Sequence, residues 1–237
     1  MTWLWRTCSS ILTLAPAIAA TVTGTVELVD SRDAGVRKRK DFAGAVVWLE
    51  PVTGVVPPPA PRTVQMLQKG KKFNPHVLAV PIGTTVEFPN LDPIFHNAFS
   101  NFSGQPFDTG LYAPGTSQKI LFKREGVVRV FCNIHSTMSA VIVVTRTPYV
   151  AVTSRSGAFR IEGAPRGEYR LRIFHERARE DVLKALERTI ALDQETVTLL
   201  PVRISESGYI EVPHKNKYGQ EYPPAVEEHV VYPGVRK

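Results

Sequence analysis

The amino-acid sequence predicts an all-β protein. Short runs in which Val, Ile, Phe and Thr alternate with polar residues recur along the chain, which is typical of half-buried strands. Between these runs lie many of the 19 prolines and 16 glycines, which commonly mark turns. A chain of 237 residues has room for one large β-domain or two smaller ones, each with its own hydrophobic core.

The first twenty residues read as an export signal and not as part of the fold. Arg6 is followed by an apolar stretch, and residues 17–19 (AIA) fit the small-x-small rule for signal peptidase. We therefore expect residues 1–20 to be a signal peptide, cleaved after Ala19 or Ala20, and the protein to be periplasmic or otherwise exported. The apolar part is too short to span a bilayer, so no transmembrane segment is predicted. An uncleaved tether or a peripheral membrane association is the alternative.

Cysteine usage points to a metal. The chain has two cysteines, and Cys8 leaves with the signal peptide, so Cys132 is the sole thiol expected after export. In an oxidising compartment an unpaired thiol is a liability unless it has a chemical role. In "FCNIHSTMSA", residues 131–140, His135 lies three positions after Cys132, and Met138 three positions after His135. A buried, inert cysteine is the alternative, but the spacing favours a ligand loop.

These donor types favour copper over zinc. Thioethers are poor ligands for zinc, whereas a thiolate, imidazoles and a weak axial thioether suit copper in both of its oxidation states. Such a site needs a second histidine, and "VEFPNLDPIFHNAFS" offers His96 after a strand that ends at Asn90. A strand end that brings His96 to the rim of a sandwich, opposite the strand that carries Cys132, would complete the site.

Residues 64–145 resemble a cupredoxin, the blue-copper β-sandwich family of plastocyanin, amicyanin and pseudoazurin. The matching motifs are "FNP" at 73–75, "VPIGTTVEFPN" at 80–90, "HN" at 96–97 and "FCNIHSTM" at 131–138. The spacing Cys-x-x-His-x-x-Met is the short ligand loop of amicyanin. The resemblance implies a Greek-key β-sandwich that holds one type 1 copper ion with three trigonal ligands and an axial methionine. By that resemblance the ligands are His96, Cys132, His135 and the axial Met138.

The resemblance also implies roles for residues around the ligands. Asn97 resembles the cupredoxin asparagine that holds the two ligand loops together. The apolar shell expected around the thiolate consists of Phe95, Phe99, Phe131 and Ile134. Electrons are expected to pass through His135 as a partly exposed ligand. Several family members carry proline beside this histidine, whereas this chain has Ile134 and Ser136 there, so the potential is left open.

The other histidines and the second mature methionine are expected outside the metal site. His76 reads as a strand-start histidine without a metal role, and His175 as a structural residue at the end of another strand. His214 and His229 lie in a polar tail and are expected to be exposed to solvent. Met66 reads as a core or linker residue.

Residues 150–176 resemble a second family, the carboxypeptidase regulatory-like, transthyretin-type β-sandwich. The marks are the turn at 156–157 before "AFRIEG" and "APRG" at 164–167 before "EYRLRI". That family normally begins with strands of the types "VxGxV" and "AVVWL", which here lie at 22–26 and 45–49. We therefore expect a smaller, discontinuous sandwich with the cupredoxin domain inserted in it. The alternative is an N-terminal hairpin added to the cupredoxin's own sheet.

The predicted organisation assigns every part of the chain. Residues 21–56 and 146–204 form the discontinuous sandwich, residues 64–145 the cupredoxin domain, and residues 205–237 an extended or disordered tail. The proline-rich stretch 51–62 is a stiff lead into the insert. The last strands are expected at 186–192 and 195–204, and one helical turn at 177–185.

Two classes of function fit this sequence. The first is an exported electron carrier, because four protein ligands leave no open position for a substrate. The second is a copper-binding or copper-delivery protein without a redox role. A decayed copper site in a scaffold protein is a third reading, against which the four intact ligands argue. The sequence shows no Ser-His-Asp set, supported carboxylate pair or phosphate loop, so we expect no enzymatic turnover.

The charge pattern bears on partners. The formal net charge is +7, and one run, "RKRK" at 37–40, reads as a solvated loop. Nothing else resembles a nucleic-acid-reading module, so no nucleic acid is expected as a partner. A mildly basic surface fits docking to an acidic redox partner protein.

Overall fold

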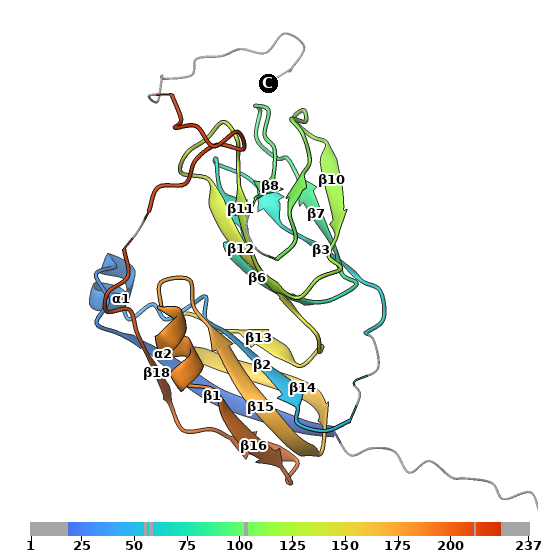
Figure 1. Ribbon diagram of the computed structural model, residues 1–237, viewed down its shortest axis with the longest axis vertical. Coiled ribbons are helices and arrows are strands. Elements are labelled where there is room, and N and C mark those ends of the chain that lie inside the picture. Colours follow the sequence, from blue (N-terminus) through green and yellow to red (C-terminus); the bar gives the residue numbers. More distant parts are fainter. Residues whose placement is uncertain (1–18, 55, 57–58, 102–103, 211, 224–237) are drawn as a thin grey trace, which may run out of the picture.

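The computed structural model describes residues 19–54, 56, 59–101, 104–210 and 212–223, and these form two β-sandwiches (Figure 1). The inserted domain comprises residues 63–145. The flanking domain comprises residues 19–51 and 150–205, which lie before and after the insert. The described residues include two short helices, α1 (Ala34–Arg39) and α2 (Glu180–Ala185). Within the same residues, no helix has the length and apolar character needed to cross a membrane.

The flanking domain consists of two sheets with a hydrophobic core between them. One sheet contains β1 (Ala19–Val29), β14 (Ala158–Pro165), β17 (Thr196–Thr198) and β18 (Val202–Ser205). The other contains β2 (Val46–Pro51), β13 (Val150–Val152), β15 (Gly167–Phe174) and β16 (Arg188–Leu192). Alternate residues such as Val22, Leu49 and Leu171 bury their side chains in the shared core.

The strand pairing confirms the discontinuous arrangement. β1 pairs with β14, and β2 pairs with both β13 and β15, so strands on either side of the insert share sheets. The alternative, in which the N-terminal strands extend the sheet of the inserted domain, is therefore wrong. The strand predicted at 186–192 is present as β16, whereas the one predicted at 195–204 is divided into β17 and β18; the expected helical turn is α2.

The inserted domain also has two sheets around a core. The first contains β3 (Thr63–Gln65), β7 (Thr85–Pro89) and β10 (Ser117–Leu121). The second contains β6 (Val77–Pro81), β8 (Phe99–Ser100), β9 (Phe107–Asp108), β11 (Gly126–Phe131) and β12 (Ser139–Thr145). The short strands β4 (Leu67–Gln68) and β5 (Phe73–Asn74) pair with each other. Met66 is buried in this core, as the core reading of that residue predicted.

Strand β12 is buried on both of its faces, which explains its unbroken apolar run. Ala140, Ile142 and Val144 face the core of the inserted domain. Val141 and Val143 point the other way and pack with Val46 and Val77 in a third cluster between the domains. A strand covered on both sides reads as continuous Val and Ile instead of alternating with polar residues. The two domains therefore join through an apolar interface of packed sheets.

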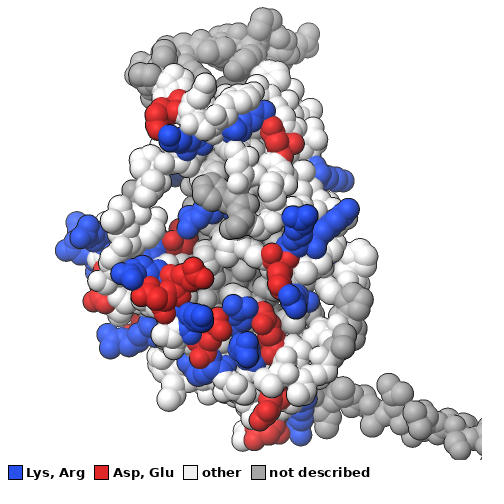
Figure 2. Space-filling model, in the orientation of Figure 1, with Lys and Arg blue, Asp and Glu red and all other residues white. Residues whose placement is uncertain are grey.

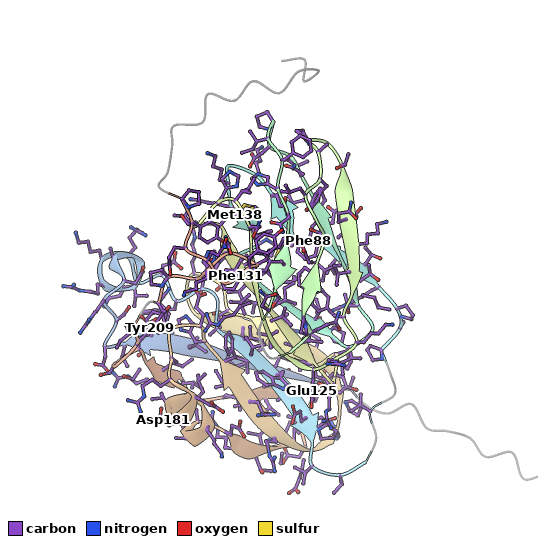
Figure 3. The ribbon with its side chains drawn as sticks, turned by 45° about the horizontal axis from the view of Figure 1, so that its top comes forward. Phe88, Glu125, Phe131, Met138, Asp181 and Tyr209 are labelled. Carbon is purple, nitrogen blue, oxygen red and sulfur yellow. The ribbon has the colours of Figure 1, made fainter. Side chains whose placement is uncertain are left out.

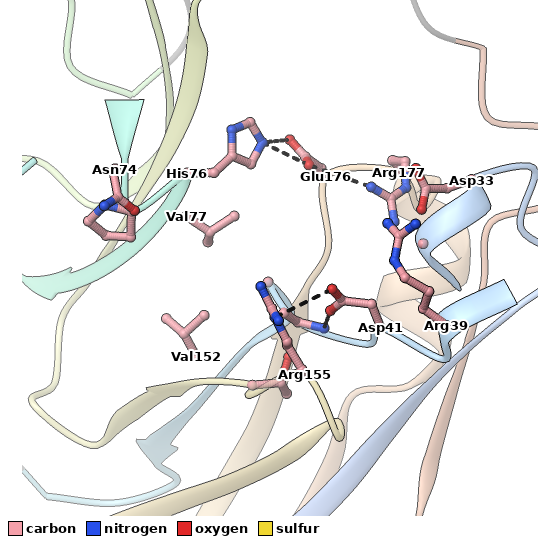
Figure 4. A pocket seen from close by; sticks show the side chains of 15 residues that line it. Asp33, Arg39, Asp41, Asn74, His76, Val77, Val152, Arg155, Glu176 and Arg177 are labelled. Atoms are coloured by element: carbon pink, nitrogen blue, oxygen red, sulfur yellow. Dashed lines mark hydrogen bonds and ion pairs between the residues drawn. The ribbon is translucent and has the colours of Figure 1, made fainter. Parts of the chain in front are cut away.

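A polar cleft borders this interface (Figure 4). His76, just before β6, faces Glu176, just after β15, and its Nε2–H donates to the Glu176 carboxylate at 2.9 Å. Its Nδ1–H donates to the carbonyl of Ser139 at 3.1 Å. The hydrogen bond to Glu176 raises the pKa of His76 above its usual value, because protonation completes an ion pair. His76 thus ties the two domains together.

One boundary differs from the sequence-based expectation. Residues 1–20 were assigned to the signal peptide, but Ala19 and Ala20 begin β1 and pair with Pro165 and Ala164. Ala20 is buried in the flanking-domain core, so its methyl group contributes to packing. Small residues fit a signal-peptidase site and a closely packed strand equally well. The sequence pattern alone therefore did not distinguish the end of a signal peptide from the start of β1. Residues 1–18 lie outside the described residues.

The turn before β14 gives a test of this architecture. Gly157 has φ +79°, and a Cβ there would lie 2.0 Å from the carbonyl oxygen of Val26 on β1. The substitution Gly157→Ala should therefore lower the free energy of unfolding by about 3 kcal/mol, from steric overlap added to left-handed strain. The measurement is urea unfolding followed by circular dichroism.

Gly163→Ala is the matched control for this change. Gly163 has φ +77°, but a Cβ added there would meet nothing within 4 Å, so only the backbone cost remains, about 1 kcal/mol. Equal losses for the two variants would contradict the close approach of the 154–157 turn to β1.

Candidate metal centre

The candidate ligands come from two loops at one end of the inserted domain. His96 precedes β8 and forms an isolated bridge with Tyr112. Cys132 follows β11, and the chain turns through His135 and Met138 before β12 begins. The Cys132 N–H donates to the Met138 carbonyl at 3.1 Å, and the Met138 N–H donates to the His135 carbonyl at 3.1 Å. These bonds close the loop on itself, so its side chains have fixed directions.

Asn97 connects the two loops, as the resemblance implied. Its Oδ1 accepts a hydrogen bond from the backbone N–H of Asn133 at 2.5 Å, and its Nδ2–H donates to Asp108 at 3.2 Å. Asn97 is fully buried, so breaking the bond to Asn133 would leave buried polar groups without partners. The clamp therefore fixes the position of the Cys132 loop relative to His96.

Three of the predicted ligands converge. The Sγ of Cys132 lies 3.8 Å from the Nδ1 of His96 and 3.5 Å from the Nδ1 of His135. The ligand atoms of this group all lie within 4.8 Å of one another, and all three residues are buried. The chain thus brings together residues that are separated by 36 positions in the sequence.

These separations fit a bound first-row metal ion. Metal–nitrogen and metal–sulfur bonds are about 2.0 and 2.3 Å long, which at a trigonal angle puts the two ligand atoms about 3.7 Å apart. The observed distances of 3.8 and 3.5 Å lie on either side of this value. One thiolate and two imidazoles are also the soft and intermediate donors that copper favours.

Met138 lies beside this group. Its side chain is fully buried in the same core cluster as Cys132, and Figure 3 shows it in the upper part of the inserted domain. Both of its backbone hydrogen bonds go to ligand-loop residues, so it cannot move independently of them. Its role as an axial ligand stays a prediction.

A carboxylate that sequence reasoning missed contacts His96. The Oδ2 of Asp92 accepts a hydrogen bond from the Nε2–H of His96 at 2.8 Å. The backbone N–H groups of Gly70 and Lys71 donate to the same carboxyl group at 2.6 and 2.8 Å. Burial opposes ionisation, but the bonds from Lys71, Gly70 and His96 outweigh it and lower the pKa of Asp92. "NLDP" reads locally as a turn, and only the fold directs Asp92 to the histidine.

Buried aromatic residues lie in the same core as the candidate metal group. Tyr112 is buried and donates its hydroxyl to the carbonyl of Phe88 at 2.9 Å. Burial, together with repulsion from negative charge on the Cys132 sulfur, raises the pKa of Tyr112, so it stays a neutral donor. Phe73 and Phe88 belong to the same core cluster as Cys132.

The expected position of Phe131 in the apolar shell around the thiolate is wrong. Successive residues of a strand point to opposite faces, and Cys132 lies in the inner core while Phe131 lies outside it. Phe131 instead contacts Phe99, with ring centroids 6.0 Å apart, and the ring of His214. Ile134 does pack against the inner core.

The C-terminal segment covers this outer face, with residues 212–223 running beside the ligand loop (Figure 1). His214 stacks on Phe131 at 4.1 Å between ring centroids, and the Tyr222 hydroxyl donates to the Cys132 carbonyl at 2.7 Å. The Lys217 N–H donates to the Asn133 side chain at 2.9 Å, and its ammonium group to Asp108 at 2.7 Å. Residues 212–223 of the predicted tail thus lie along the surface of the inserted domain, and residues 224–237 lie outside the described residues.

The tail histidines were expected to be exposed, and for His214 this is wrong. It is half-buried between Phe131 and Tyr222, and this burial lowers its pKa. A tail without strand or helix periodicity gives no sign of such a contact. His229 lies outside the described residues. His175 is buried and faces Glu206 at 3.6 Å, in keeping with the structural role expected for it.

His135 is also more enclosed than an exposed exit residue would be. Only 8% of its surface is accessible, and its ring meets that of His96 edge to face at 4.8 Å. The C-terminal segment approaches the residues just before it in the loop. Surface access to the metal group is therefore narrow.

Comparisons with known proteins give partial likenesses to copper proteins. No family model and no curated protein matches the chain. A purple cupredoxin from Nitrosopumilus maritimus is 27% identical over 34% of this chain and 98% of its own, with a TM-score of 0.32. A reduced amicyanin variant is 19% identical over 35% of this chain and 81% of its own, with a TM-score of 0.33.

A third solved structure matches this chain over only a small part of its own length. The copper-containing nitrite reductase of Thermus scotoductus SA-01 is 28% identical over 50% of this chain, with a TM-score of 0.34. The match spans 28% of that enzyme's own length. Each of these solved structures thus resembles part of this chain. The resemblance of the flanking domain to the carboxypeptidase regulatory-like family stays a prediction.

The tail contacts predict how well Cys132 is protected. In metal-free protein, Tyr222→Phe removes only the hydroxyl that binds the Cys132 carbonyl. A hydrogen bond of this kind contributes about 1 kcal/mol, so Cys132 should react with a disulfide reagent about fivefold faster as the loop opens more often. The measurement is the rate of thiol labelling under native conditions.

Tyr218→Phe is the control for the loss of a tyrosine hydroxyl elsewhere in the tail. Tyr218 lies in the same segment, but 69% of its surface is exposed. Its hydroxyl loss should leave the labelling rate unchanged. Equal rates for the two variants would show that the tail does not restrain the ligand loop.

Proposed function

We propose that this protein is an exported, cupredoxin-type copper protein that carries electrons. One copper ion would be held by His96, Cys132 and His135, with Met138 as the axial ligand. The bound ion would supply one-electron chemistry, and the chain's own residues would fix its ligands and exclude water. The observation that carries the proposal is the buried convergence of one thiol and two imidazole nitrogens at 3.5 and 3.8 Å.

The enclosure of the group supports a carrier over a delivery protein. His96, Cys132 and Met138 have no accessible surface, and His135 has 8%. A buried, closed ligand set exchanges electrons without offering a coordination position to a substrate, and it resists ligand exchange with a partner. The same argument supports a role without enzymatic turnover of its own. Copper delivery is the second candidate, and it would require this loop to open.

The partner would be an acidic redox protein that docks near the ligand end. Lys69, Lys71 and Lys72 are exposed in the turn whose backbone binds Asp92. Beside it Leu91 is 51% exposed, and Leu111, next to the His96 bridge partner Tyr112, is 57% exposed. An apolar centre with lysines around it suits electrostatically steered, short-lived contact. On the face in Figure 2, by contrast, charges of both signs are interspersed over the flanking domain.

Copper binding by the thiolate gives a direct optical test. The oxidised, copper-loaded protein should show an intense thiolate-to-copper charge-transfer band in the visible range. Cys132→Ser should abolish this band because a hydroxyl group is a much weaker donor to the metal. Ser136→Ala, in an exposed position of the same loop, should retain it. A colourless copper complex of the unchanged protein, with thiol titration unaffected by copper, would refute the proposed site.

Metal retention distinguishes the two candidate functions. A carrier should cycle reversibly between its two oxidation states with all of its copper retained, because the buried ligands do not rearrange. The measurement is repeated reduction and reoxidation in the presence of a mild Cu(I) chelator, with the visible band and total copper followed. Loss of the reduced ion to the chelator would favour delivery instead.

A further inference from the structure

We infer that Asp92 is a positioning residue that selects the metal-binding nitrogen of His96 and favours the oxidised state of the bound ion. This inference rests on the proposed function, and it adds a residue that is not itself a ligand. Its basis is a short chain of hydrogen bonds from the Lys69–Lys72 turn through Asp92 to His96.

The first step concerns which nitrogen of His96 carries the hydrogen. An ionised carboxylate only accepts hydrogen bonds, and a neutral imidazole has one N–H and one lone pair. Because the Oδ2 of Asp92 lies 2.8 Å from Nε2, the hydrogen belongs on Nε2. The lone pair is then on Nδ1, the nitrogen that lies 3.8 Å from the Cys132 thiol. Asp92 thus prepares His96 for metal binding through Nδ1.

The second step is that Asp92 is held firmly in place. Gly70 and Lys71 each donate a backbone N–H to its carboxyl group, and its own N–H donates to the Asn90 side chain at 3.1 Å. Only 8% of Asp92 and none of His96 is exposed. Solvent therefore screens the charge weakly, and the carboxylate acts on the imidazole at a fixed distance.

The third step gives the direction of the effect. A carboxylate that accepts the N–H of a metal-binding imidazole makes that imidazole a stronger donor. The added electron density and the negative charge stabilise Cu(II) more than Cu(I), because the oxidised ion carries the greater positive charge. Asp92 should therefore lower the reduction potential of the site.

The test is the reduction potential of copper-loaded Asp92→Asn. Asparagine keeps an oxygen that can accept from Nε2–H but removes the charge. We expect the preference for Cu(I) over Cu(II) to rise about tenfold, which is an upward shift of about 59 mV for a one-electron couple. Glu87→Gln is the control, since it removes one negative charge from β7 in the same domain, where Glu87 bonds Gln65. A shift no larger than that of the control would overturn the inference.

The spectrum and reversible couple of the wild-type protein test the proposed function independently of the role of Asp92. A wild type without a charge-transfer band or a reversible couple refutes the proposed copper function. A normal wild type with an unshifted Asp92→Asn refutes only the role of Asp92.

A second measurement uses only the metal-free wild-type protein, so it does not depend on copper loading or on whether a variant folds. Nitrogen-15 NMR of the metal-free wild type at neutral pH reports which ring nitrogen of His96 is protonated. The hydrogen should be on Nε2. A His96 ring protonated on Nδ1 would overturn the inference, whatever the fate of the variants.

Discussion

The double burial of strand β12 is the constraint on which the rest of the structure depends. One face of this strand closes the core of the inserted domain, and the other packs against Val46 of the flanking domain. Neither face can shift without exposing apolar surface, which costs about 25 cal/mol for each Å². Because the ligand loop ends where β12 begins, the same packing anchors the loop that carries Cys132, His135 and Met138.

The metal group depends on this anchor and on two polar contacts that cross between loops. Asn97 joins the His96 segment to the Cys132 loop, and Asp92 joins the Lys69–Lys72 turn to the His96 ring. The side chains of Asn97, Asp92 and His96 are buried, so each contact is costly to break and holds its partners in one geometry. The candidate ligand atoms are thus held in one arrangement by the chain itself, as the proposed change of oxidation state without rearrangement would require.

The C-terminal segment covers the outer side of the ligand loop. In a bare β-sandwich, Phe131 would be an exposed aromatic residue on the outer face of its sheet. Here His214 covers it, and Tyr222 reaches the backbone of Cys132 itself. Any partner that approaches from this side meets the tail before it meets the loop. Leu91 and Leu111, on the side of His96 and Asp92, are by contrast more than half exposed.

The sequence by itself determined the local features of this protein. Alternating apolar residues predicted the strands, and the order and spacing of His96, Cys132 and His135 predicted a metal group that the fold does bring together. The split pattern on either side of the insert predicted which strands share sheets. These features could be predicted because strand periodicity and ligand spacing are properties of short segments.

Only the tertiary structure decided the contacts between distant segments. The bond from Asp92 to His96, the face taken by Phe131, the packing of Ala20 in β1 and the stacking of His214 on Phe131 follow from the assembled sheets. Tyr222 and Cys132 lie 90 positions apart, and no local sequence pattern indicates that they are in contact. Such pairs form because burial brings them together after the strands have packed, so their physical cause lies in the whole fold and not in any one segment.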